Sequence, residues 1–312
     1  MPVAPLPIRD GLNPTRLILH PHHLETFFAP PTVLQYLLAR FPDDAARLTQ
    51  KVRDGEVRLQ DGTVATADTR LFARMELWLY REPPEEPVVP FEHGIVYEDE
   101  DILVVDKPHF LSTIPRGSFI RQTLLVRLRV ELDIPTLAPA HRLDRVTAGL
   151  VLFTKRRELR GSYQLLFQNR QVGKTYFAVA PVLPDLIGRP EPTVVKTRII
   201  KQHGVAQASQ VPGEPNSHSE VELVDHRGDL GLYRLRPITG KTHQLRLHMF
   251  HLGAPILQDN FYPEFIGREL TDYRFPLQLL SATLEFTDPL SGQERIFRSN
   301  RQLELWPDEI KY

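Results

Sequence analysis

The spacing of apolar residues predicts a series of strands and three helices in the larger part of the chain. Short runs of β-branched and other apolar residues, such as Ile102-Leu103-Val104-Val105, are typical of buried strands. Further strands are predicted over 149–154, 176–180, 219–224, 232–237 and 279–286. Helices are predicted over 122–132, over 158–168, and directly after Thr239-Gly240-Lys241-Thr242. Strands and helices do not alternate regularly, so we expect a mixed fold and not a series of βαβ units.

A hairpin turn is predicted between two of these strands. His226-Arg227-Gly228-Asp229 has the composition of such a turn, which makes part of the sheet antiparallel. The chain contains neither an internal repeat nor a Gly-x-Gly-x-x-Gly phosphate loop. The sequence therefore argues against an enzyme that uses a nucleotide cofactor.

The N-terminal residues predict a small module over about 30–80. Apolar residues recur there at helical spacing, and Glu56–Val64 has the pattern of a strand, an Asp-Gly turn and a second strand. The helical set is Val33, Leu34, Leu37, Leu38 and Phe41.

Residues 1–29 show no clear period, and we treat them as an N-terminal extension. Three histidines lie in this extension (His20, His22, His23), and a polar loop is favoured over a metal site because no further ligand stands at a recognisable spacing.

A proline-rich acidic segment over 81–92 is the predicted linker to the remainder of the chain, 93–312. Proline cannot continue a helix or a central strand, so such a segment is extended. Residues 81–101 carry eight acidic side chains and one basic one, a net charge of -7. This stretch is expected to be a solvated connector.

Composition excludes several classes of protein. Of 312 residues, 41% are hydrophobic and 25% are charged, an ordinary balance for a soluble chain with a sizeable core. No stretch approaches the ~20 apolar residues of a membrane span, and the first residues lack the features of a secretory signal. We therefore expect a cytoplasmic protein with no membrane partner. The absence of cysteine excludes disulfides, thiolate metal sites and a thiol nucleophile.

The charged residues are unevenly distributed along the chain. The total of 38 basic and 39 acidic residues gives a net charge of -1, which by itself does not indicate a nucleic-acid partner. Residues 141–176, however, carry eight lysines and arginines against two acidic residues, a net charge of +6. This window is a candidate phosphate-binding face, and a solvated helix surface is the alternative.

The first stretch with chemical potential is Pro139–Lys155. Asp144 stands between Arg142 and Arg145 in a loop that leads directly into an apolar strand. Positive neighbours favour the ionised carboxylate, which a nucleophile or general base requires. A surface ion pair is the alternative interpretation.

The second stretch is Thr239–Gly253. Thr242 is the predicted N-cap of a helix that Gly253 ends. Arg246 falls in the first turn, where a cation gains nothing from the helix dipole, so its side chain needs a partner outside the helix. One face of the helix is apolar (Leu245, Met249, Leu252), and the histidines match no zinc pattern, so we interpret them as polar-face or capping residues (His243, His248, His251).

Together these two stretches resemble the RluA family of pseudouridine synthases. Its signature is His-Arg-Leu-Asp-Arg, then Thr-Ser-Gly-Leu, with a downstream Thr-Gly-Arg-Thr-His-Gln-(Leu/Ile)-Arg-(Val/Leu)-His. The resemblance extends to 98–108, 174–179 and 251–259, and covers about residues 95–288. Two residues depart from the pattern: Ala148 stands for serine, and Lys241 stands for arginine, which keeps the charge but loses the forked donor.

The resemblance implies an α+β fold in which 93–312 form a catalytic domain with a mixed, largely antiparallel sheet. The 30–80 module resembles the S4 RNA-binding domain, a small α/β module that often precedes this catalytic domain. The implied activity is a cofactor-free isomerisation of a uridine in ribosomal or transfer RNA, in which the glycosidic bond moves from N1 to C5. RNA is the implied partner, neither a metal nor a nucleotide cofactor is implied, and we expect a monomer.

The resemblance also assigns roles to residues. Asp144 is the nucleophile, Arg246 pairs with it, and Tyr176 packs on the flipped base near C5. Arg142 fills the space that the base leaves. Attack of Asp144 at C6 of the base and at C1′ of the ribose both remain open. Further residues expected to contact RNA are Arg145, Lys174, Lys241 and His243.

Two other classes of function are compared with this one. A non-catalytic RNA-binding or ribosome-assembly factor could use the same basic face, but it would need none of Asp144, Tyr176 and Arg246. A hydrolase that uses the histidines is disfavoured, because the chain has no serine in a Gly-x-Ser-x-Gly elbow.

Overall fold

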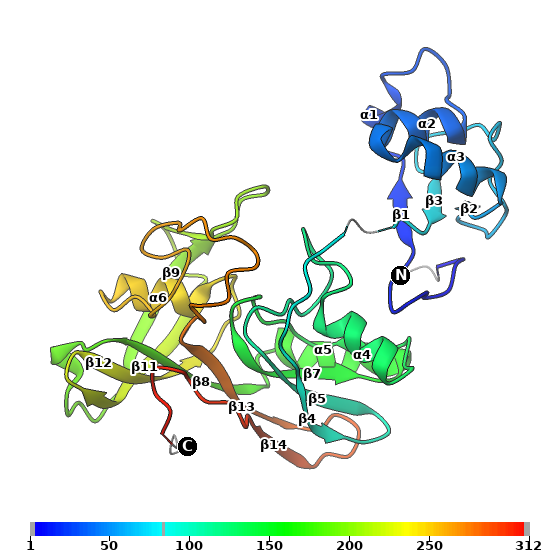
Figure 1. Cartoon of the computed structure of the whole chain (residues 1–312). Helices are drawn as coiled ribbons and strands as arrows, with labels where there is room; N and C mark the ends of the chain where they lie inside the picture. Colours follow the sequence, from blue (N-terminus) through cyan, green and yellow to red (C-terminus); the bar gives the residue numbers. More distant parts are fainter. Residues whose placement is uncertain (1–3, 83–84, 309–312) are drawn as a thin grey trace. The chain divides into compact units, whose positions relative to one another are not determined.

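The structure is a computed structural model that describes residues 4–82 and 85–308. The chain forms two compact units, Met1–Glu85 and Glu86–Tyr312 (Figure 1). The division falls inside the 81–92 segment, of which residues 83–84 lie outside the described residues. Each unit is described by itself.

The first unit is a three-stranded sheet packed against short helices. The helix predicted from the spacing of apolar residues is α2 (Val33–Arg40), and its N-cap is Thr32. The Thr32 hydroxyl accepts from the backbone of Gln35, whose side chain accepts from the backbone N–H of Thr32, a capping box. The sheet order is β1-β3-β2. The remaining elements are β1 (Thr15–Ile18), α1 (Pro21–Leu24), η1 (Pro42–Asp44), α3 (Ala45–Arg53), β2 (Arg58–Leu59) and β3 (Glu76–Leu79).

Strand β1 lies in the stretch for which the sequence predicts no element. It pairs antiparallel with β3, with Leu17 opposite Leu77. Leu19 is fully buried in the same core as Leu37 and Leu77. A strand of four residues offers only two alternations of apolar and polar positions, too few to stand out as a period. Residues 15–19 therefore share the core of the module that the sequence predicts over about 30–80.

The second unit contains a mixed, largely antiparallel sheet, as the resemblance implies. Its strand order is β10-β9-β11-β12-β8-β13-β7-β5-β4, with β14 on β13 and β6 on β7. Among the described pairs, β13 and β7 run parallel and the others run antiparallel. The strands are β4 (Gly94–Glu98), β5 (Ile102–Lys107), β6 (Ala138–Pro139), β7 (Ala148–Thr154), β8 (Gly173–Pro181), β9 (Thr193–Ile200), β10 (Ser209–Val211), β11 (Ser217–Arg227), β12 (Leu230–Pro237), β13 (Leu279–Thr287) and β14 (Glu294–Arg298).

Helices cover the two halves of this sheet. Successive residues of β5 face opposite layers: Leu103 packs with the residues of α4, and Val104 packs with those of α5. Helix α6 packs on the other half, beside β9, β11 and β12 (Figure 1). No helix within residues 4–82 and 85–308 has the length and apolar character needed to cross a membrane. The helices are α4 (Leu124–Glu131), η2 (Arg157–Leu159), α5 (Arg160–Gln168), η3 (Pro184–Leu186) and α6 (Gln244–His251).

The two halves of the sheet meet where β7 and β13 lie side by side. Strand β13 pairs antiparallel with β8 and, at Leu280 and Ser281, parallel with β7. Gly149 has a φ of 109° at this point, and a β-carbon there would lie 2.2 Å from the carbonyl oxygen of Ser281. Such a contact is impossible, so the close approach of these strands requires glycine.

The Gly149→Ala variant is expected to lose about 3 kcal/mol of stability, because it combines a disfavoured backbone conformation with a backbone clash. Urea unfolding followed by circular dichroism measures this loss. Gly161→Ala is the matched control, since nothing lies within 4 Å of its β-carbon position in α5. The control should be stabilised by up to about 1 kcal/mol. Equal midpoints for the two variants would contradict the proposed requirement for glycine.

Candidate active site

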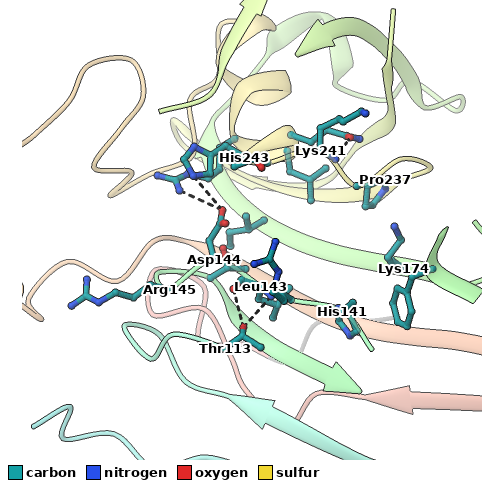
Figure 2. Close-up of a pocket in the computed structure, with 18 of the residues that line it drawn as sticks. Thr113, His141, Leu143, Asp144, Arg145, Lys174, Pro237, Lys241 and His243 are labelled. Atoms are coloured by element: carbon teal, nitrogen blue, oxygen red, sulfur yellow. Dashed lines mark hydrogen bonds and ion pairs between the residues drawn. The ribbon is translucent and has the colours of Figure 1, made fainter. Parts of the chain in front are cut away.

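A cavity of about 760 Å³ in the second unit brings the two chemical stretches of the sequence together (Figure 2). Its walls come from 140–145, which precedes β7, and from 239–246, which leads into α6. Residues 112–119 and the start of β8 contribute further wall. The cavity is therefore built from segments that lie more than a hundred residues apart in the chain, and the sheet brings them together.

The walls of this cavity are strongly cationic. Among the described residues that line it, Asp144 is the sole carboxylate, and seven side chains are arginine or lysine. Positive charge around a concave surface attracts a polyanion and favours the ionised state of any carboxylate inside it. The seven cations are Arg116, Arg142, Arg145, Arg170, Lys174, Lys241 and Arg246.

Asp144 lies in a tight turn directly before β7. The backbone N–H of Thr147 donates to the carbonyl of Asp144 at 3.1 Å. The hydroxyl of Thr113 donates to the carbonyl of Leu143 at 2.9 Å and accepts from its N–H at 3.1 Å. The side chain of Asp144 is 35% exposed, so the carboxylate lies on the cavity wall within reach of a ligand while its backbone is fixed.

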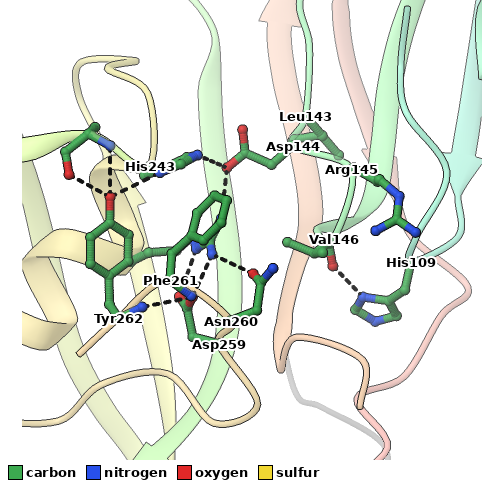
Figure 3. Close-up of polar contacts among 12 residues, drawn as sticks. His109, Leu143, Asp144, Arg145, Val146, His243, Asp259, Asn260, Phe261 and Tyr262 are labelled. Atoms are coloured by element: carbon green, nitrogen blue, oxygen red, sulfur yellow. Dashed lines mark hydrogen bonds and ion pairs between the residues drawn. The ribbon is translucent and has the colours of Figure 1, made fainter. Parts of the chain in front are cut away.

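Two side chains, the buried Lys107 and the half-buried His109, hold the backbone that follows Asp144. Lys107, which is fully buried, donates to the carbonyl of Arg145 and to two carbonyls of its own loop. His109 Nδ1 lies 2.7 Å from the carbonyl of Val146 and must donate to it (Figure 3). Burial lowers the pKa of Lys107 well below its usual range and that of His109 to about 4. These contacts leave the turn little freedom to move.

Arg246 lies between two carboxylates. Its Nη1 is 3.6 Å from Oδ2 of Asp144, the partner expected from the sequence. Its Nε donates to Oδ2 of Asp259 at 2.7 Å, a closer contact that the sequence analysis did not identify. Burial lowers the pKa of Arg246, but the hydrogen bond and charge of Asp259 and the charge of Asp144 raise it more, so the pKa is raised overall. Arg246 is thus a buried, permanent cation beside Asp144.

Asp259 is itself held in place. Its side chain is 1% exposed, and Oδ1 accepts from the backbone N–H groups of Phe261 at 2.7 Å and Tyr262 at 3.2 Å. The rings of Phe261 and Tyr262 lie over the guanidinium of Arg246, 5.0 and 5.5 Å from its central carbon. The only sequence signal for Asp259 was its place in the 251–259 stretch of the resemblance.

The start of helix α6 differs from the prediction. Its N-cap is His243, in the left-handed region with a φ of 56°, and not Thr242. The side chain of His243 makes no capping hydrogen bond. The side chain of Gln244 instead holds the loop before the helix, since it accepts from the backbone N–H of Lys241 at 3.0 Å and from the Thr239 hydroxyl at 2.6 Å. The predicted apolar face and the end of the helix at a left-handed glycine are confirmed: Leu245, Met249, Leu252 and Gly253.

His243 thereby lies beside Asp144. Its Nε2 is 3.8 Å from Oδ2 of Asp144, and its Nδ1 is 3.0 Å from the hydroxyl of Tyr262. Burial lowers the pKa of His243 to about 4, so the imidazole is neutral at pH 7. His243 therefore adds no positive charge to that of the seven cations of the wall.

Tyr176 lies on the same wall as Asp144. It belongs to β8, is 8% exposed and packs with the residues under α6. Burial, together with the charge of Asp144, raises the pKa of Tyr176 to about 12. Tyr176 is therefore a neutral phenol at pH 7 that lines the cavity, and its hydroxyl interacts with Ser281 of β13.

The other residues expected to contact RNA are placed differently from one another. Arg142 and Lys241 are exposed at the cavity, and Lys174 is half-buried on its wall. Arg145 instead donates to the carbonyl of Leu270 at 2.6 Å and lies over the ring of Phe119. Two further arginines of the wall were not among the residues predicted to contact RNA. They are Arg116, and Arg170, which stands in the +6 window. Among the described residues, no group of three or more acidic or histidine side chains is placed to hold a metal ion.

Comparison with known proteins identifies the family. Residues 101–251 match the family model described as RNA pseudouridylate synthase. The dual-specificity RNA pseudouridine synthase RluA of Escherichia coli is 32% identical over 224 residues, which are 70% of this chain and 95% of RluA. Human pseudouridylate synthase RPUSD2 is 31% identical over 57% of this chain, but the match spans only 32% of that longer protein.

The fold agrees with these matches. The structure of human RNA pseudouridylate synthase domain containing 1 superimposes with a TM-score of 0.52 and 25% identity, covering 70% of this chain and 86% of the human one. Residues 101–251, which match the family model, lie in the second unit and contain Asp144. The chain therefore belongs to the RluA family of RNA pseudouridine synthases.

Proposed function

We propose that the chain isomerises a uridine of folded RNA to pseudouridine, with Asp144 as the nucleophile. The observation that carries this proposal is the cavity itself, in which one carboxylate stands among seven cations. A uracil inside a stacked helix is out of reach of such a carboxylate, so the nucleotide must turn out of its stack to enter. Exposed cations of the wall, such as Arg170 and Lys241, bind the phosphates on either side of the flipped nucleotide.

Each group at the site has a part in the reaction. Asp144 adds to C6 of the base or C1′ of the ribose, and the N1–C1′ bond breaks in both routes. The base then turns and C5 bonds to C1′, the bond between Asp144 and the nucleotide breaks, and the proton on C5 passes to water or to the freed carboxylate. Arg246 stabilises the negative charge of Asp144, and Tyr176 packs against the base near C5. Arg142, exposed at the cavity, fills the space that the flipped base leaves in the RNA.

The proposed substrate is a ribosomal or transfer RNA, and the chain acts as a monomer in the cytoplasm. The first unit, an S4-like module in this proposal, adds a second contact to the same RNA. The alternative is an RNA-binding or assembly factor that works without turnover. The arrangement of Asp144 against Arg246, and of Arg246 against the buried Asp259, favours the enzyme, because phosphate binding requires neither carboxylate.

Pseudouridine mapping of ribosomal and transfer RNA tests the proposed function directly. Cells that lack the gene should lose the modification at one or a few uridines, and the purified protein should restore it. The same experiment names the substrate. Unchanged maps, together with no product from purified protein and RNA of the deletion strain, would support the assembly factor.

The Asp144→Asn variant should lose more than about a thousandfold in pseudouridine formation, because the amide is not a nucleophile. RNA affinity should stay equal or rise, since the change removes the one negative charge of the cavity wall. Nucleoside chromatography and filter binding measure the two effects. Asp133→Asn is the control: Asp133 lies away from the cavity with a φ of 52°, which asparagine adopts readily. Turnover that survived in Asp144→Asn would remove Asp144 from the mechanism.

The Asp259→Asn variant should lower kcat about ten- to a hundredfold with little change in KM, because the guanidinium of Arg246 loses its fixed orientation toward Asp144. Steady-state kinetics on the mapped RNA separates the two constants, and circular dichroism checks folding. Asp272→Asn is the matched control in the same segment, since Asp272 pairs with the exposed Arg274. A raised KM with normal kcat would show instead that Asp259 serves binding.

A further inference from the structure

We propose that Nε2 of His243 accepts a hydrogen bond from the ribose 2′-hydroxyl of the target nucleotide. The inference rests on the proposed function and adds to it the group by which the site distinguishes RNA from DNA at the reacting position. It follows from the hydrogen bonds around Tyr262, which decide which nitrogen of His243 carries the proton (Figure 3).

The proton of the Tyr262 hydroxyl is already committed. This oxygen lies 2.7 Å from the carbonyl oxygen of Ala208, which can only accept, so Tyr262 donates its one proton there. The backbone N–H of Ala208 donates back to the Tyr262 oxygen at 3.1 Å. The contact of 3.0 Å between Tyr262 and Nδ1 of His243 therefore needs its proton from the imidazole. Nδ1 carries the hydrogen of His243.

Nε2 of the neutral ring is consequently an acceptor. It lies at the cavity wall, 3.8 Å from Oδ2 of Asp144, which is an acceptor as well. His243 cannot donate to Asp144 in this tautomer, so the two atoms do not form an ion pair or a hydrogen bond. They present a pair of acceptors to the cavity, and the ligand that suits such a pair brings an O–H or N–H donor.

The position beside the nucleophile selects the donor. Asp144 reacts at C6 or C1′, so its oxygen approaches the glycosidic bond of the bound nucleotide. The 2′-hydroxyl stands on the carbon next to C1′ and can rotate its proton toward a neighbouring acceptor. The other donor of uridine, N3–H, lies across the ring from C6 and points away from the glycosidic bond. An acceptor beside Asp144 therefore meets the 2′-hydroxyl, the group that distinguishes RNA from DNA.

The ring of His243 is held in the orientation that this contact needs. Residue 243 is the N-cap of α6 and has a left-handed conformation. Its side chain is 7% exposed, packs 5.2 Å from the ring of Phe261 and forms the hydrogen bond to Tyr262. The ring cannot turn over without breaking the bond between Nδ1 and Tyr262. Preorganised acceptors of this kind discriminate against analogues that lack the matching donor.

Nitrogen-15 NMR of the histidine rings in the intact chain tests the tautomer independently of activity. Between about pH 6 and 8, His243 should show a protonated Nδ1 and an unprotonated Nε2. The signal is assigned by its loss in His243→Gln. A ring protonated at Nε2 would overturn the inference whatever the activity of the enzyme.

Competition between RNA probes tests the function of the acceptor. The probe is a synthetic stem-loop of the sequence around the mapped uridine, with uridine, 2′-deoxyuridine or N3-methyluridine at that position. Each modified probe competes against the uridine probe, which reports its relative affinity whether or not it reacts. His243→Phe should lower the affinity for the uridine probe about three- to tenfold. Its preference for uridine over 2′-deoxyuridine should fall by the same factor. Its preference over N3-methyluridine should not change.

His243→Gln is the matched variant, because it has the same backbone cost as phenylalanine but places an amide oxygen near the Nε2 position. It should recover part of the preference for uridine over 2′-deoxyuridine. Unchanged preference in His243→Phe, or an effect confined to N3-methyluridine, would overturn the inference while leaving the enzyme intact. Failure of the unaltered chain to convert the uridine probe would instead count against the proposed function.

Discussion

The site depends on a buried guanidinium that lies between two carboxylates. Taking a charge out of water costs several kcal/mol, and only well-placed partners offset that cost. Asp259 is such a partner for Arg246, at a distance of 2.7 Å. Asp259 also accepts hydrogen bonds from two backbone N–H groups, which hold it in place. The remaining Nη1 then lies toward Asp144 at 3.6 Å. The segment after α6 and the turn before β7 are thus connected through one side chain, and Asp144 remains available because Asp259 carries the main pairing.

The distribution of charge explains how a chain with a net charge of -1 can hold a polyanion. Its acidic residues are concentrated outside the cavity, and many of them pair with nearby arginines, as Asp101 does with Arg156. Inside the cavity seven cations face one carboxylate. Global charge averages over these two environments, whereas an RNA phosphate within a Debye length of the cavity responds to the local one.

The sequence predicted the residues that carry the pattern of the family and the elements with a clear period. Asp144, Arg246 and Tyr176 stand in recognisable stretches, and β5 and β7 are continuous apolar runs because both of their faces are buried. Apart from the pair of Arg246 and Asp144, which the resemblance implied, contacts between distant segments could not be predicted in this way. Asp259 meets Arg246 only after the chain folds back from α6, and the proton on His243 is decided by Ala208, 35 residues upstream. Local patterns do not contain such pairings, and the four-residue β1 is too short to show a period.

The joint at Gly149 has a consequence for how substrate preference can change. At Gly149 the backbones of β7 and β13 approach each other directly, with no room for a side chain between them. Much of the cavity wall, in contrast, is formed by loops attached to this sheet, among them 112–119 and 140–145. The lengths and side chains of such loops can vary without a change in the sheet beneath them. The architecture thus separates a rigid sheet from loops whose composition can change, which is the usual basis on which one fold serves several binding specificities.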